Sequence, residues 1–130
     1  MAKKFVTSHD ILLDDENATL IPGMVNDPSM VADADGNKYM RGGTLLTADK
    51  EFDLNNDGSV VLVPTTDATV AQGILRQDYN ILDGPVPASI IISGTINRHQ
   101  MDEDTQKVYT SELKKALKAV LPKISVVDRY

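Results

Sequence analysis

A segment near the middle of the chain has the clearest potential for metal chemistry. Its oxygen-bearing side chains have the spacing of positions 1, 3 and 5 of an EF-hand calcium loop: Asp53, Asn55 and Asp57. Gly58 follows at position 6, where such a loop needs a residue that permits a sharp turn. The segment is therefore a candidate calcium site.

The same residues have a simpler interpretation as a β-turn. An EF-hand loop also needs a bidentate carboxylate at position 12, and this chain has Pro64 there. The residues after Gly58 are apolar and β-branched, so they indicate a strand rather than an exit helix. Asn, Asp and Gly are frequent in hairpin turns because they tolerate positive φ angles. We favour the turn and keep calcium binding as the alternative.

Two histidines, His9 and His99, are the other candidates for catalysis, and they lie far apart in the sequence. No spacing of Ser, His and Asp indicates a nucleophilic triad, and no phosphate-binding loop or dinucleotide motif occurs. The chain has no cysteine, which excludes thiol catalysis and Cys-based metal sites. We therefore expect neither an enzyme nor a cofactor. A small hydrolase that uses His99 with surface carboxylates is the least supported alternative.

The composition of the 130-residue chain excludes further classes. Its net charge is −6, and it has only six aromatic residues, none of them Trp. An acidic chain repels the phosphate backbone, and few aromatic rings leave few surfaces for base stacking. The N-terminus lacks the apolar run of a secretory signal, and no apolar run approaches the ~20 residues of a membrane helix. We expect a soluble protein, made in the cytoplasm, that binds neither nucleic acid nor membranes.

From residue 20 onward, short β-branched runs between turn residues predict a mainly β (α+β) domain. The runs at 59–63, 69–75 and 88–93 are bounded by Gly, Pro and Asp. No helical pattern separates them, which favours a small β-sandwich or barrel-like body over a parallel sheet. We expect Pro22 to begin a turn after the first strand and Pro64 to stop a later strand.

The last thirty residues have a helical pattern. One apolar face contains Leu113, Ala116, Leu117, Val120 and Leu121. Acidic residues at the start and lysines towards the end suit the helix dipole. We predict one amphipathic helix over about 105–121, closed by Pro122, and an edge strand within 123–130. Residues 20–130 then form a single domain, and residues 1–19 form a flexible N-terminal arm.

Two glycines, Gly73 and Gly94, lie inside strand-like runs. A glycine in a strand usually marks a bulge or the close approach of another backbone. A bulge within the monomer is the simpler interpretation. A neighbouring chain packed against the glycine, as in a trimer, is the functional alternative.

Three segments, taken in order, carry a family resemblance: RGGTLL at 41–46, AQGIL at 71–75 and ASIIISGTINR at 88–98. Together with the C-terminal helix and the final residues 124–127, they resemble the head decoration proteins of tailed bacteriophages. These are the lambda-type capsid-cementing proteins and the related base domains of head fibres. The resemblance covers about residues 20–127, and the order of the short motifs carries more weight than any one of them.

The resemblance implies a late structural protein that forms a homotrimer on the outer surface of an expanded phage capsid. It would bind the major capsid protein and stabilise the head against internal pressure. Its N-terminal arm would add to a capsid strand, with four apolar contacts: Phe5, Val6, Ile11 and Leu12. The alternative function is a calcium- or ligand-binding β module of a fibre or adhesion assembly.

Overall fold

The structure of the chain, a computed structural model, describes residues 10–13, 18–52 and 58–128. Within these ranges the fold is mainly β, as the sequence predicts. The strands are β1 (Thr19–Val25), β2 (Tyr39–Met40), β3 (Leu45–Thr47), β4 (Val61–Thr65), β5 (Gly73–Leu75), β6 (Tyr79–Asn80), β7 (Val86–Asn97) and β8 (Ile124–Val127). The helices are α1 (Glu103–Val108) and α2 (Ser111–Val120), with short 3-10 helices η2 (Ala68–Val70) and η3 (Arg98–Gln100). No helix in these ranges is both long and apolar enough to cross a membrane.

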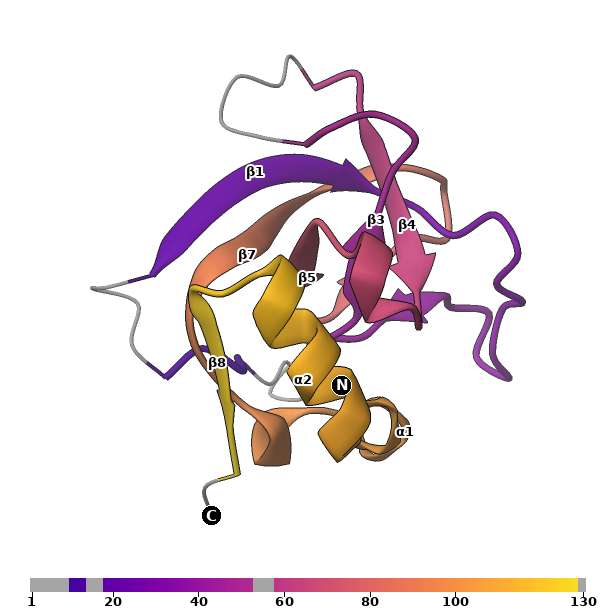
Figure 1. The fold of residues 1–130 in the computed structure, drawn as a ribbon. Helices are drawn as coiled ribbons and strands as arrows, with labels where there is room; N and C mark the ends of the chain where they lie inside the picture. The colour runs from indigo at the N-terminus through magenta and orange to yellow at the C-terminus, as the bar shows by residue number, and fades with distance from the viewer. Residues whose placement is uncertain (1–9, 14–17, 53–57, 129–130) are drawn as a thin grey trace.

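The larger sheet closes on itself. Its strand order is β1-β4-β3-β5-β7-β8, and β1 also pairs with β7, so the first five of these strands form a ring of pairings. The strand β8 lies outside the ring and pairs with the end of β7 (Figure 1). The pairings β1–β4 and β7–β8 are parallel, and the other pairings in this sheet are antiparallel. The sheet is therefore mixed.

Alternation along the ring strands separates two hydrophobic clusters. The inner cluster takes residues from all five ring strands: Ile21, Val25, Met40, Leu46, Phe52, Val60, Leu62, Leu75, Ile81, Ala88 and Ile90. The helix-side cluster is Ile11, Leu45, Ala68, Ala71, Ile74, Ile91, Ile96, Met101, Tyr109, Leu117 and Ile124. Neighbouring residues enter different clusters because successive side chains of a strand point to opposite faces. One set of strands thus serves two cores.

Two prolines lie inside strands, where the sequence predicts a turn and a stop. The strand β1 continues through Pro22, and β4 includes Pro64. Proline cannot donate a backbone hydrogen bond, so it is accepted where a strand has a partner on one side only. The β1–β4 pairing covers Met24 and Val25 of β1 and the first two residues of β4, so both prolines lie beyond it. The expected strand ends at these prolines are wrong for this reason.

Gly23, the residue after the first of these prolines, is required by packing. A Cβ atom at Gly23 would lie 2.8 Å from Cε1 of Phe52, which is closer than side-chain carbons approach. The buried ring of Phe52 therefore fills the space above the glycine within the inner cluster. Pro22 and Gly23 belong to a curved strand rather than to a turn (Figure 1).

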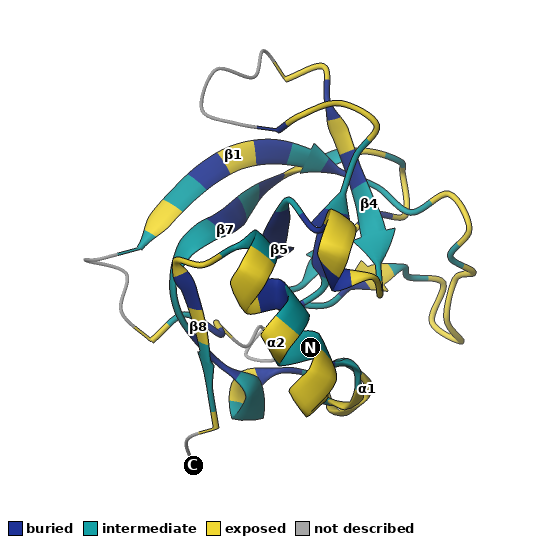
Figure 2. Cartoon of the chain, viewed as in Figure 1, coloured by how far each residue is buried: buried dark blue, intermediate teal, exposed yellow. Residues whose placement is uncertain are grey.

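The predicted single helix over 105–121 is divided into α1 and α2. Asp102 caps the first helix by accepting from the amide of Asp104, and Thr110 caps the second by accepting from the amide of Leu113. Helix α2 covers the ring with buried Leu117 and leaves its outer face exposed (Figure 2). The predicted C-terminal edge strand is confirmed as β8.

Tyr109, between the two helices, explains the break. Its side chain is buried in the helix-side cluster, and its hydroxyl donates to the carbonyl of Gly43 at 2.5 Å. Burial raises the pKa of the Tyr109 hydroxyl, which favours the neutral form that donates this bond. The chain turns inward at Tyr109, so one straight helix cannot pass through it.

Candidate functional site

The beginning of the described chain, residues 10–13, is fixed to the body; we call it the anchored segment. Asp10 forms an ion pair with Arg76, with 2.8 Å between Oδ2 and Nη2. The other carboxylate oxygen accepts from the Arg76 Nε at 3.2 Å and from the Leu12 amide at 3.1 Å. Partial burial opposes ionisation of Asp10, but these hydrogen bonds outweigh it and lower the pKa of the carboxyl group.

The backbone of the anchored segment pairs with the end of β7. Leu12 forms an antiparallel bridge with Ile96, and the Leu13 amide donates to the carbonyl of Thr95 at 3.0 Å. Ile96 is also paired with Val126 of β8. The end of β7 therefore lies between the anchored segment on one side and β8 on the other.

This arrangement corrects the expected role of Ile11 and places Leu12, a second expected capsid contact, beside the body. Ile11 is 0% exposed and belongs to the helix-side cluster, and Leu12 packs against that cluster. Ile11 is thus used within its own chain rather than held ready for a capsid contact. Phe5 and Val6, the other two expected contacts, lie outside the described residues. The arm predicted over 1–19 contains a segment that belongs to the body.

Both glycines singled out in the sequence lie against parts of the same chain. A Cβ atom at Gly73 would overlap the side chain of Ile90. Gly94 has a φ of +140°, and a Cβ atom there would lie 3.0 Å from the Cβ of Ala18. The register of β1 and β7 shifts nearby, between Thr19 and the next residue. The close approaches are therefore intramolecular, in keeping with the simpler interpretation.

The candidate calcium ligands Asp53, Asn55 and Asp57 lie outside the described residues. The chain after Gly58 forms strand β4 rather than a helix, as its β-branched residues predict. Within the described ranges, no group of three or more His, Cys, Asp or Glu side chains is placed to hold a metal ion.

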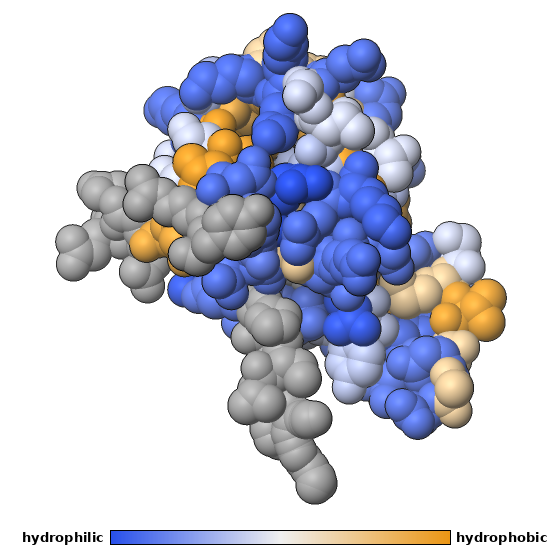
Figure 3. Space-filling view, turned by 90° about the horizontal axis from the view of Figure 1, so that it is seen from below, coloured by the Kyte–Doolittle hydropathy of each residue, from blue (hydrophilic) through white to orange (hydrophobic). Residues whose placement is uncertain are grey.

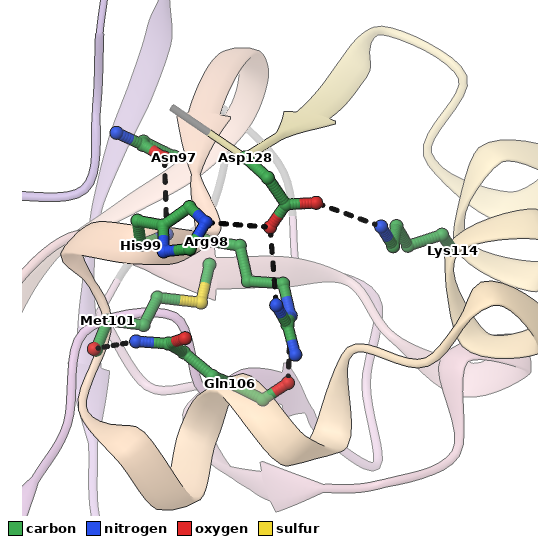
Figure 4. Close-up of polar contacts among 7 residues, drawn as sticks. All are labelled: Asn97, Arg98, His99, Met101, Gln106, Lys114 and Asp128. Atoms are coloured by element: carbon green, nitrogen blue, oxygen red, sulfur yellow. Dashed lines mark hydrogen bonds and ion pairs between the residues drawn. The ribbon is translucent and has the colours of Figure 1, made fainter. Parts of the chain in front are cut away.

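A cluster of three basic side chains surrounds the carboxylate of Asp128, just after β8 (Figure 4). Arg98 Nη1 lies 3.3 Å from one carboxylate oxygen, and Lys114 Nζ lies 3.4 Å from the other. His99 Nε2 lies 4.0 Å from the first oxygen. Slight desolvation opposes ionisation, but the Arg98 hydrogen bond and the Lys114 charge lower the pKa of Asp128. The anionic partner of the three basic side chains is the carboxylate of Asp128.

Further hydrogen bonds orient the basic cluster. Arg98 Nε donates to the carbonyl of Gln106 at 3.0 Å, and the Gln106 side-chain amide donates to the carbonyl of Met101 at 2.9 Å (Figure 4). The backbone amide of His99 donates to Oδ1 of Asn97 at 3.1 Å. His99, the residue considered for hydrolysis, thus lies in a group that joins η3, α1, α2 and the end of β8. The contacts of this group hold these elements together.

A hollow of about 520 Å³, lined by both polar and apolar residues, lies between β3, β4 and α1. Two of its hydroxyl groups are engaged locally. Thr44 Oγ1 donates to the carbonyl of Arg41 at 2.6 Å, and Ser29 Oγ donates to Asp27 at 2.7 Å. These hydroxyls therefore stabilise the loops that carry them and do not form a nucleophile–base pair.

No local sequence pattern predicts the Asp10–Arg76 pair or the cluster around Asp128. Arg76 and Asp10 are 66 positions apart, and Arg98 and Asp128 are 30 apart. Only the sheet brings these residues together. The face seen in Figure 3 is mainly hydrophilic, with small and separate apolar patches in its described part. No protein-family model and no curated protein sequence matches the chain.

Proposed function

We propose that the chain is a structural virion protein that binds the outside of an expanded phage capsid as a homotrimer. There it would stabilise the capsid against internal pressure. The observation that carries the proposal is the anchored segment, because it fixes Asp10, the residue that follows residues 1–9, against the body. A segment attached in this way suits a protein whose N-terminal residues bind a partner and whose body covers that partner.

The three segments that resemble decoration proteins also support the proposal. They contain the first two residues of β3, all of β5 and most of β7. These strands are consecutive neighbours in the sheet, since β3 pairs with β5 and β5 pairs with β7. We infer that the body is a small β-barrel, in which the motifs form one continuous half of the ring. The order of motifs along the chain is thus also an order in space.

Residues 1–9 are the proposed capsid-binding segment, with Phe5 and Val6 as its apolar contacts. Such a segment would pair with a strand of the major capsid protein, so backbone hydrogen bonds would supply affinity and the apolar side chains would supply specificity. Three such segments in a trimer would bind far more tightly than one, because the first contact raises the effective concentration of the others.

The test combines a mass measurement with a binding measurement. Native mass spectrometry of the full chain gives its oligomeric state, and sedimentation with expanded capsids stripped of their decoration protein gives binding. We expect a trimer that binds expanded capsids, and a loss of binding when residues 2–9 are deleted. The matched control is Lys50→Ala, an exposed change on the body. A monomer without affinity for expanded capsids would contradict the proposal.

A further inference from the structure

We propose that the outer edge of β8 and the adjacent face of α2 form a second interaction surface, which accepts an extended acidic segment of another protein. The proposal does not depend on the capsid assignment, since it concerns the opposite end of the chain. It rests on three features that lie together: a free strand edge, an apolar floor and a row of lysines.

The strand edge is the first feature. The strand β8 ends the order of the sheet, so in the described part of the chain its pairing is with β7 alone. The amide of Gly94 donates to the carbonyl of Lys123, so the ladder turns the backbone groups of Ser125 and Val127 towards β7. The N–H and C=O of Val126, the residue between them, point away from β7. An added strand would use these groups.

The groove beside this edge is the second feature. It has a volume of about 350 Å³ and lies between α2 and β8. Its apolar lining comes from Leu117 of α2 and from Ile124 and Val126 of β8. Leu117 and Ile124 are buried, whereas Val126 is half-buried. The groove offers apolar contact directly next to the free backbone groups.

The lysines are the third feature, and their charge favours the binding of an acidic segment. Lys114, Lys115 and Lys118 line the groove on the α2 side. Residues 102–130 hold six basic and five acidic side chains, in a chain whose net charge is −6. The groove is thus a basic strip on an acidic protein. A neutral or basic segment would gain no electrostatic attraction from the lysines, whereas the carboxylates of an acidic segment would pair with them.

The ion pairs around Asp128 hold this surface in place before a partner binds. Asp128 holds Lys114 at 3.4 Å and Arg98 at 3.3 Å, which fixes the end of β8 against α2. The edge is therefore rigid before binding, and a partner strand has less conformational entropy to remove. The exposed lysines Lys115 and Lys118 remain to meet the partner.

The occupant is assigned to another protein because the described acidic clusters of this chain have other conformations. Asp33 accepts from the backbone amides of Asp35 and Asn37 within a turn. Asp102 and the two residues after it cap and begin α1. Neither cluster is an extended strand, so neither can pair along β8 as it stands.

The test uses the full chain and a capped eight-residue peptide, Glu-Thr-Val-Thr repeated twice, which places glutamate and valine on the same face of an extended strand. We expect binding by calorimetry, with amide shifts in the nuclear magnetic resonance spectrum at Ser125–Val127 and slower hydrogen exchange at Val126. Two control peptides separate charge from strand pairing. One replaces glutamate by lysine, and the other keeps glutamate but carries N-methyl groups on every residue. Neither should bind. Equal binding of either control peptide would overturn the proposal.

A pair of variants locates the site. The exposed double change Lys115→Glu/Lys118→Glu should weaken peptide binding by about tenfold or more. The matched control, Lys50→Glu/Lys107→Glu, makes the same change in net charge at exposed lysines elsewhere and should bind as the wild type does. Undiminished binding by the first variant would contradict the proposal. Amide shifts at Val126 that depend on protein concentration alone, with no peptide bound, would assign the edge to a second copy and overturn it as well.

Discussion

The inner cluster and the helix-side cluster take neighbouring residues from the same strands, yet they are closed in different ways. The inner cluster is closed by the ring of strands and by Phe52. The helix-side cluster is closed by elements from the two ends of the chain, which include Ile11, Leu117 and Ile124. The first depends on strand pairing around the ring. The second depends on whether the chain ends stay docked.

This difference indicates which of the two clusters a bound partner would stabilise. Both proposed interaction surfaces, residues 1–9 and the β8 edge, adjoin elements that close the helix-side cluster. A partner that binds either surface would therefore stabilise that cluster first, since it binds only the docked form. The inner cluster would persist with or without a partner. The predictions that follow test this separation.

The largest effect is expected from matched core truncations. Leu62→Ala removes buried contacts of the inner cluster, and Leu117→Ala removes those of the helix-side cluster. Each should lower the free energy of unfolding by about 2–5 kcal/mol, measured by urea denaturation. Hydrogen exchange should distinguish them, because Leu117→Ala should deprotect α2 and β8 while the ring strands stay protected. Equal deprotection of both regions would show that the clusters unfold as one unit.

A smaller effect is expected from two tyrosine hydroxyls, one beside each cluster. Tyr109→Phe removes the bond to the Gly43 carbonyl, and Tyr79→Phe removes the acceptor for the Ser89 amide at 3.0 Å. Each should cost about 1–3 kcal/mol, because a buried or half-buried backbone group loses its partner. Thermal unfolding of both variants would measure this. A neutral Tyr109→Phe would mean that the Gly43 carbonyl finds another donor.

Tyr109 also predicts a dependence of stability on alkaline pH. Burial raises the pKa of Tyr109 in the folded chain, so its contribution to stability is complete below the pKa of about 10 of an unfolded tyrosine. Above that pH the unfolded chain loses the proton first, and the contribution falls. Between pH 10 and 11, the wild type should therefore lose stability more steeply than Tyr109→Phe. Parallel curves from urea denaturation would contradict this.

The ion pairs of the chain ends should have smaller effects still. Asp10→Asn and Asp128→Asn remove charges that are each more than a third exposed, so each should cost less than about 1 kcal/mol at neutral pH. Both carboxyl groups have a lowered pKa in the folded chain, so their contribution exists above the unfolded pKa of about 4 and is lost as the pH falls below it. The difference between each variant and the wild type should vanish in acid. A difference that persists at pH 2 would indicate a packing effect instead.

The smallest effect is expected from calcium. The segment 53–57 connects Phe52 to strand β4, so a bound ion would stabilise the inner cluster selectively. We expect a turn, and therefore no heat in a calcium titration and no change in the melting temperature. The comparison variant is Asp53→Ala/Asp57→Ala. Heat that this variant abolishes would favour the calcium-binding β module instead.

The sequence predicted the parts of the fold that depend on local patterns. Alternation and turn residues indicated the mainly β fold, and the apolar face around Leu117 indicated α2. It left a sandwich and a barrel-like body both open, because the pairing of β1 with β7 that closes the ring joins residues such as Ile21 and Ile90 that are far apart in the chain. Pro22 and Pro64 read as strand breakers because their tolerance depends on which neighbours the strand has.

The candidate site was less accessible to sequence analysis for the same reason. Ile11 reads as an exposed anchor because nothing near it in the sequence shows that the end of β7 covers it. Asp128 is one of many acidic residues, and its basic neighbours come from η3 and α2. Thr110, by contrast, carries a local signal in its side chain, since a helix N-cap needs only residues within the next turn.

The last residues of β7 have a mechanical consequence. Residues 94–97 pair with β8 along one side and with the anchored segment along the other. Segments near the two ends of the chain are therefore hydrogen-bonded to the same short stretch. Residues 11–13 run antiparallel to β7 and β8 runs parallel to it, so residues 10 and 128 both lie at the Asn97 end of this stretch. A force that separates them would act across the strands and open the hydrogen bonds one after another, beginning beside Asn97. Such a force would therefore act first on the contacts of residues 94–97, before it reaches the ring of strands.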